Sequence, residues 1–229
     1  MRLSRPQAIL FDLDGTLVDS LPDLAFALDS TLLELGLPAA GLDKVSNWVG
    51  NGIERLVKRG LTGDMQAEPD AALLAAALAH FRRIYAQQNG RRSVLFDGAR
   101  EGLQDLHKRG IALGIVTNKA TQFTGPLLAA MDIDRFFSVV VCGDTLDKCK
   151  PEPEPLWHAL SCLDVPAAQS WMVGDSRHDM AAARAAGMTA VAVPYGYNHG
   201  EAIESAAPDL LVSSIRELAE RVPDDRISG

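Results

Sequence analysis

Short apolar runs alternate with helical segments through most of the chain, and this alternation restricts the possible fold more than any other feature. Six runs are continuous rather than alternating in polarity, as is typical of parallel strands covered on both faces. They span residues 8–11, 111–116, 138–142, 170–173, 189–193 and 210–212. Helical patterns occupy residues 98–108, 121–131, 154–163, 176–186 and 214–221. We therefore expect an α/β fold with a doubly wound parallel sheet.

The alternation is interrupted between residues 21 and 92, which contain no convincing strand. Ser20 and Asp23 have the spacing of a capping box, and leucines follow at helical spacing until Gly36 and Pro38. Apolar residues at 53, 56 and 57 predict a second helix, and the alanine-rich residues 70–86 predict a third. We therefore expect a small all-helical domain over 21–92, inserted into a core domain formed by 1–20 and 93–229.

Two carboxylates follow the first predicted strand directly. Asp12 and Asp14 flank Leu13, and Gly15 permits a sharp turn. Both acids can therefore gather at the carboxyl end of the strand, where open α/β sheets bind their ligands. Two acids this close repel each other unless a cation or a shared proton separates them, and Mg²⁺ prefers such oxygen ligands. The alternative that the same residues allow is a solvated Asp-Gly turn.

A second acidic pair follows the predicted strand at 170–173. Asp175 lies at the strand exit, where it can complete a metal site. Asp179 lies one helical turn further on. Asp179 equally fits an N-terminal helix cap without any metal, because acidic residues are favoured in the first turn of a helix.

Polar residues also follow the predicted strand at 111–116. Thr117 and Asn118 can bind phosphate oxygens together with N–H groups of the next helix, although Thr-Asn is also an ordinary turn sequence. Further on, Lys150 precedes the first of three alternating prolines, which predict a stiff, extended segment that holds this lysine. Lys148 competes for the same role, and the proline after Lys150 favours Lys150. For either lysine the alternative is a solvated surface position.

Composition and charge exclude several classes of protein. The net charge of −8 has the wrong sign for binding nucleic acid, although one small anion pocket is compatible with it. No run approaches the ~18 apolar residues of a membrane span. The three cysteines and five histidines show neither a disulfide framework nor a zinc-binding spacing. We therefore expect a cytoplasmic monomer or homodimer that acts on a small anionic metabolite, not on nucleic acid or a membrane.

The motifs, taken in this order, resemble those of the haloacid dehalogenase superfamily of phosphohydrolases. The D-x-D-G-T motif of the superfamily matches residues 12–16, and its hydroxyl motif matches Thr117. Its lysine motif matches Lys150, and its acidic motif matches Asp175 and Asp179. The helical insertion resembles the C1-type cap of that superfamily, and the resemblance extends from residue 8 to about 212. Within the superfamily, the runs at 48–52, 143–146 and 195–200 resemble bacterial phosphoglycolate phosphatases most, although sugar-phosphate phosphatases share several of them.

The resemblance implies a Rossmann-like core and a Mg²⁺-dependent phosphomonoester hydrolase with an aspartyl-phosphate intermediate. It makes Asp12 the nucleophile, Asp14 the general acid and base, and Lys150 a catalytic cation. It implies phosphate binding by Thr117, Asn118 and Lys150, and metal binding by Asp12, the main-chain carbonyl of Asp14, and Asp175. The remaining predicted site residues have supporting roles: Gly15, Thr16, Ser176 and Asp179.

The inserted helices are expected to select the substrate. Gly50, Asn51 and Gly52 predict a tight turn whose backbone approaches the site, and Arg55 is a candidate ligand for a substrate carboxylate, with a solvated surface position as the alternative. The resemblance favours 2-phosphoglycolate. The alternatives are another small sugar phosphate such as N-acetylmuramic acid 6-phosphate, and then a phosphomutase or a dehalogenase of the same fold. A non-enzymatic phosphate-binding module would have no need of Asp14.

Overall fold

The computed structural model describes residues 4–224. At its centre is a six-stranded sheet with the order β5-β4-β1-β6-β7-β8, in which all neighbouring strands are parallel. The strands are β1 (Ala8–Phe11), β4 (Ala112–Val116), β5 (Val139–Val141), β6 (Ser170–Gly174), β7 (Thr189–Ala192) and β8 (Leu210–Leu211). All six predicted strands are confirmed, with ends that differ by at most one residue.

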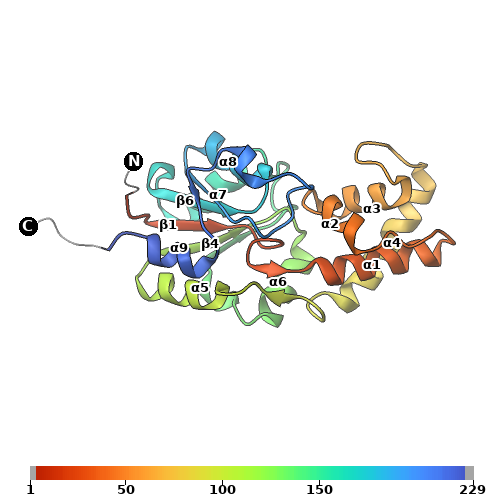
Figure 1. The fold of residues 1–229 in the computed structure, drawn as a ribbon, viewed down its shortest axis with the longest axis horizontal. Helices are drawn as coiled ribbons and strands as arrows, with labels where there is room; N and C mark the ends of the chain where they lie inside the picture. Colours follow the sequence, from red (N-terminus) through yellow and green to blue (C-terminus); the bar gives the residue numbers. More distant parts are fainter. Residues whose placement is uncertain (1–3, 225–229) are drawn as a thin grey trace, which may run out of the picture.

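Helices cover both faces of this sheet (Figure 1). One face packs against α5 (Ala99–Lys108), α6 (Thr121–Ala130) and α9 (Ile215–Arg221), and the other against α7 (Glu154–Leu163) and α8 (Arg177–Ala186). Three short 3₁₀ helices lie in the connections: η1 (Asp134–Phe136), η2 (Ala167–Gln169) and η3 (Ile203–Ala206). Since crossovers run to both sides of β1, the predicted doubly wound α/β fold is confirmed.

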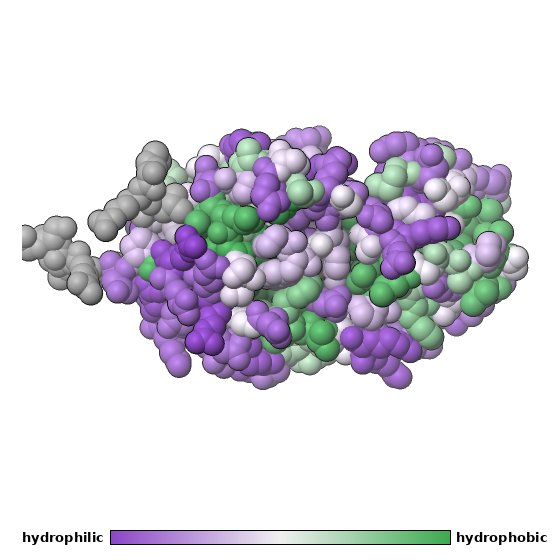
Figure 2. Space-filling view, viewed as in Figure 1, coloured by the Kyte–Doolittle hydropathy of each residue, from purple (hydrophilic) through white to green (hydrophobic). Residues whose placement is uncertain are grey.

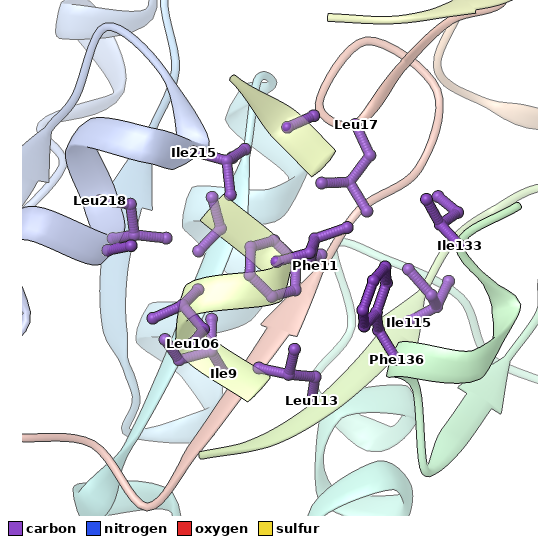
Figure 3. Close-up of a cluster of buried hydrophobic side chains, with 14 of the residues drawn as sticks. Ile9, Phe11, Leu17, Leu106, Leu113, Ile115, Ile133, Phe136, Ile215 and Leu218 are labelled. Atoms are coloured by element: carbon purple, nitrogen blue, oxygen red, sulfur yellow. The ribbon is translucent and has the colours of Figure 1, made fainter. Parts of the chain in front are cut away.

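The strands are apolar along their whole length because both of their faces are buried. Figure 3 shows Ile9 and Phe11 of β1 in one cluster with Leu106 of α5 and Ile215 of α9. Leu10, whose side chain has the opposite orientation in the strand, belongs to a second buried cluster with α7 and α8. This two-sided burial fixes β1 in the middle of the sheet and sets the position of the loop that follows it.

Residues 21–88 form four helices around a third buried cluster. They are α1 (Leu21–Glu34), α2 (Leu42–Trp48), α3 (Gly52–Thr62) and α4 (Ala71–Gln88), and Figure 1 shows them beyond one end of the sheet. The sequence predicted only three helices here, and α2 was missed. Of its seven residues only Val45 and Trp48 are buried, which is too few to produce a helical apolar period.

The chain crosses between the core and these helices at β2 (Val18–Asp19) and β3 (Val94–Leu95), which pair antiparallel. The buried carboxylate of Asp23 accepts hydrogen bonds from the N–H groups of Gly90, Arg92 and Ser93 and from Ser93 Oγ, at 2.6–3.2 Å. The predicted capping box of Ser20 and Asp23 is wrong. The Ser20 hydroxyl is buried with no hydrogen-bond partner among the described residues, and Asp23 joins the two crossings instead.

The face of the molecule in Figure 2 is mostly hydrophilic, and its hydrophobic areas are separate from one another. The exposed ring of Phe26 is covered by the guanidinium of Arg92, 3.9 Å from the ring centroid. Within residues 4–224, no helix combines the length and the apolar character that crossing a lipid bilayer requires.

Candidate active site

The loop after β1 carries the first two aspartates. The N–H of Asp12 continues the sheet by donating to Val173 O at 2.9 Å, and the chain then reverses, with Gly15 N–H donating to Val18 O at 2.9 Å. Gly15 has φ +89°, and a Cβ at this position would lie 2.3 Å from Oδ2 of Asp175. Only glycine fits this turn, which brings the carboxylates of Asp12 and Asp175 together at the carboxyl edge of the sheet.

Asp12, Asp175 and Asp179 form an acidic cluster in which one carboxylate oxygen from each lies within 4.8 Å of the others. Lys150 is almost completely buried beside it, with Nζ 2.9 Å from Asp12 Oδ1 and 2.7 Å from Asp179 Oδ1. The other oxygen of Asp179 accepts hydrogen bonds from the N–H and hydroxyl of Ser176 in a capping box at the start of α8. Asp179 is therefore both the N3 residue of the α8 capping box and a counterion of Lys150.

Asp175 has neutral partners only. Its carboxylate accepts hydrogen bonds from Thr16 Oγ1 at 2.7 Å and from the N–H of Tyr197 at 2.6 Å. No ion pair joins it to a basic side chain in the part of the chain that the structure describes. Gly196 permits the approach of this loop, since a Cβ there would lie 2.3 Å from Asp175 Cβ.

The electrostatics of the cluster favour a bound cation. Burial raises the pKa of Asp175 to about 8, and the charges of Asp179 and Asp12 act in the same direction. Burial also raises the pKa of Asp12 to about 6, against the opposing effect of Lys150. Carboxylate oxygens at these separations are suitable ligands for a hard divalent cation, whose charge would remove the repulsion. The residues present therefore fit a divalent metal site.

Thr117 and Asn118 directly follow β4. Thr117 is buried and lines the same cavity as Asp12. The side-chain amide of Asn118 bonds the main chain of Lys150, with Oδ1 accepting from Lys150 N and Nδ2 donating to Lys150 O, both at 3.0 Å. Its side chain therefore positions Lys150. The segment around Lys150 is not extended as predicted, because it forms a turn closed by a hydrogen bond from Glu152 N–H to Cys149 O.

A cavity open to solvent lies between this edge of the sheet and the inserted helices. The core supplies Asp12, Asp14, Thr117, Asn118 and Lys119, and the helices supply Leu24, Val49, Gly50, Gly52, Ile53 and Leu56. The predicted turn at residues 50–52 is found against the core. Gly50 O accepts from Asn118 Nδ2 at 3.4 Å, and Asn51 Nδ2 lies 2.8 Å from His178 Nε2.

Arg55 is not among the residues that line this cavity. Its guanidinium pairs with Glu68 at 3.0 Å, and its side chain is 44% exposed. The surface interpretation therefore fits Arg55 better than the predicted contact with substrate. The physical reason is that α3 directs Arg55 toward the loop before α4, where Glu68 supplies a counterion. Within the described residues that line the cavity, Lys119 is the one cation.

Lys119 and Tyr85 were not recognised as site residues from the sequence. Lys119 Nζ lies 3.2 and 3.1 Å from the two carboxylate oxygens of Asp14 and donates to the hydroxyl of Tyr85. Lys119 adjoins Thr117 and Asn118, so its place after a strand was a usable signal. Tyr85 lies on α4, and no local pattern shows that this face of the helix contacts the core.

Two histidines of the core also meet the inserted helices. The rings of His178 and His199 are 5.7 Å apart, edge to face, and His199 Nδ1 lies 2.9 Å from Asn47 O. Burial lowers the pKa of both histidines. Their contacts with Asn47 and Asn51 join the core to the α2–α3 region, which the sequence did not predict.

Comparison with known proteins supports the resemblance to haloacid dehalogenase-like phosphohydrolases that the motifs indicate. The model of the haloacid dehalogenase-like hydrolase family matches residues 9–193. Proteins named phosphoglycolate phosphatase are similar over almost the whole chain. That of Nitrosococcus oceani is 47% identical over 94% of this chain and 96% of its own, and that of Thiobacillus denitrificans is 45% identical over 93% and 94%.

Solved structures agree with these sequence relatives. A predicted phosphoglycolate phosphatase from Haemophilus somnus superposes with a TM-score of 0.89 at 33% identity, covering 95% of this chain and 98% of its own. CbbY from Rhodobacter sphaeroides, solved in complex with phosphate, gives a TM-score of 0.76 at 25% identity over 93% and 96%. The chain therefore belongs to the haloacid dehalogenase-like hydrolase family and is an enzyme of phosphatase type.

Proposed function

We propose that this protein hydrolyses a small phosphomonoester, 2-phosphoglycolate first among them, in a Mg²⁺-dependent reaction through an aspartyl-phosphate on Asp12. One observation carries the proposal: two aspartates of one loop line the same cavity, each paired with its own buried lysine. Asp12 pairs with Lys150 beside the acidic cluster, and Asp14 pairs with Lys119 away from it. The relatives named phosphoglycolate phosphatase support the choice of substrate.

In the first step, an oxygen of Asp12 attacks phosphorus and the bond from phosphorus to the leaving oxygen breaks. Oδ1 of Asp12 accepts from Leu13 N–H at 2.7 Å and from Lys150. These bonds occupy Oδ1, and in this proposal Oδ2 is the attacking oxygen. Mg²⁺ held by Asp12, the main-chain carbonyl of Asp14, and Asp175 would supply positive charge against the repulsion between carboxylate and phosphate.

In this proposal Asp14 moves the protons. It donates a proton to the leaving oxygen, and it then accepts a proton from the water that attacks the aspartyl-phosphate. The second attack breaks the bond between phosphorus and Asp12, releases inorganic phosphate and regenerates the carboxylate. Thr117 donates a hydrogen bond to the phosphoryl oxygens and Lys150 balances their charge. Asn118 and Asp179 hold Lys150, and Thr16 holds Asp175.

We further propose that residues 21–92 act as a cap domain over a core domain of 1–20 and 93–229. The support is that the cavity takes its walls from both parts, and that the two chain crossings are joined by β2, β3 and the hydrogen bonds of Asp23. The cap contributes apolar side chains and the backbone of Gly50 and Gly52 to the wall of the cavity.

The test is kcat/KM for 2-phosphoglycolate, N-acetylmuramic acid 6-phosphate and p-nitrophenyl phosphate, with Mg²⁺ and after treatment with EDTA. We expect the highest value for 2-phosphoglycolate and loss of turnover with the chelator. Phosphatase activity that survives EDTA would contradict the metal-dependent mechanism. An isomerised sugar phosphate in place of inorganic phosphate would indicate a mutase. A higher kcat/KM for N-acetylmuramic acid 6-phosphate would assign that compound as the substrate in place of 2-phosphoglycolate.

A further inference from the structure

Each aspartate of the β1 loop has its own lysine, but the two lysines are held differently. Lys150 is fixed by Asp179 at 2.7 Å, and both residues belong to the core. Lys119 pairs with Asp14 at 3.1 Å, and its further partner is the hydroxyl of Tyr85 on α4 of the cap. The arrangement around Asp12 is therefore complete within the core, whereas the arrangement around Asp14 includes a residue of the cap.

Lys119 supplies the hydrogen bonds that fix the Asp14 carboxylate. Among residues 4–224, no other side chain or N–H group donates to either oxygen of Asp14. The Lys119 side chain is only 3% exposed. The ammonium of Lys119 is therefore enclosed between the Asp14 carboxylate and the Tyr85 hydroxyl.

Tyr85 packs between an aromatic ring of the cap and one of the core. Its ring lies 5.5 Å from Phe81 on the same helix and 4.9 Å from Phe123 on α6 of the core, measured between centroids. The ammonium of Lys119 also lies 4.8 Å from the centroid of the Tyr85 ring. The position of the Lys119 ammonium therefore depends on α4 remaining packed against the core.

We infer that Lys119 is a positioning residue that aims Asp14 at the leaving oxygen, and that Tyr85 makes this positioning depend on the cap. The inference rests on the proposed function of Asp14 as the acid. Lys119 keeps its own protons throughout, and the proton that reaches the leaving oxygen comes from Asp14. An alkyl phosphate, whose leaving alkoxide needs a proton, therefore depends on Lys119, and p-nitrophenyl phosphate, whose leaving group needs none, does so much less.

The test compares Lys119→Met and Tyr85→Phe with wild type on propyl phosphate, 2-phosphoglycolate and p-nitrophenyl phosphate. For Lys119→Met we expect kcat/KM to fall about 30-fold or more for both alkyl esters and less than about 5-fold for p-nitrophenyl phosphate. Tyr85→Phe removes a single oxygen. Its kcat/KM should also fall more for the alkyl esters than for p-nitrophenyl phosphate, but by smaller factors. Lys58→Met is the matched control, because Lys58 pairs with Glu54 and Glu68 outside the cavity.

A double-mutant cycle with Asp14→Asn separates positioning from a general structural effect. In the Asp14→Asn background, Lys119→Met should change the rate on propyl phosphate by less than about 2-fold, since there is no acid left to position. Equal losses on all three substrates, or additive losses in the cycle, would overturn the inference. A loss confined to 2-phosphoglycolate would overturn it too, by assigning Lys119 to the substrate carboxylate. Wild-type protein inactive on all three esters would instead refute the proposed function.

Discussion

Replacing Asp23 with alanine is expected to lower the free energy of unfolding by about 4 kcal/mol. Its carboxylate accepts hydrogen bonds from four donors in residues 90–93, where the chain returns to the core just before β3. Of these donors, the N–H and the hydroxyl of Ser93 are buried. Each buried donor left without a partner costs about 2 kcal/mol, which gives the total, whereas the N–H groups of Gly90 and Arg92 reach water at little cost. The Arg92 guanidinium, 3.6 Å away and 41% exposed, adds little.

The assay is thermal and urea unfolding of Asp23→Ala and of Ser20→Ala, followed by circular dichroism. For a chain of 229 residues, about 4 kcal/mol corresponds to a Tm lower by roughly 8–16 °C. Ser20→Ala removes a buried hydroxyl that has no partner, so we expect a change within about 0.5 kcal/mol or a small gain in stability. Equal losses of stability in the two variants would show that Ser20 and Asp23 act together as a helix cap. That result would refute the argument that Asp23 stabilises the protein through its hydrogen bonds to residues 90–93.

Three further outcomes are expected. Asp12→Asn should abolish turnover with the fold retained, whereas the exposed Asp147→Asn should not, and mass spectrometry of quenched wild-type enzyme should find phosphate on Asp12. Burial raises the pKa of Asp12 to about 6 and that of Asp175 to about 8, so Mg²⁺ would compete with protons for these carboxylates. The Kd for Mg²⁺ should therefore fall roughly tenfold or more from pH 6 to pH 8, as measured by calorimetry. Gly196→Ala should displace Asp175 and raise the Mg²⁺ concentration that activity requires. An unchanged Mg²⁺ requirement in activity titrations would contradict the role of Asp175 as a metal ligand.

The sheet and its covering helices could be predicted almost residue by residue because two-sided burial leaves a strong local signal. β1 has all four residues fully buried, and its apolar run ends at Phe11, where the strand itself ends. The short helix α2 lacked such a signal. The Ser20 and Asp23 pair gave a misleading one, since the local spacing of a capping box says nothing about N–H groups that arrive from about 70 residues further along the chain.

The acidic part of the site was predictable for a topological reason. Asp12 and Asp175 each follow a parallel strand, and β1 and β6 are neighbours, so their exits meet at one edge. The cap side could not be predicted in the same way. Helical spacing shows which residues share a face but not which face meets the core. Arg55 was therefore a candidate for the substrate carboxylate with a surface position as the alternative, and in the structure it pairs with Glu68. The contact of Tyr85 with Lys119 was missed.

The balance of charge in the site explains why a divalent cation suits it. Four buried or nearly buried carboxylates, those of Asp12, Asp14, Asp175 and Asp179, face the two ammonium groups of Lys119 and Lys150. Without a metal, burial leaves the excess negative charge poorly solvated, which raises the pKa of Asp12 to about 6 and that of Asp175 to about 8. Those two residues are also the ones placed to bind a cation. In the proposed mechanism, one divalent ion would replace the protons on Asp12 and Asp175 and offset the excess negative charge of the cluster.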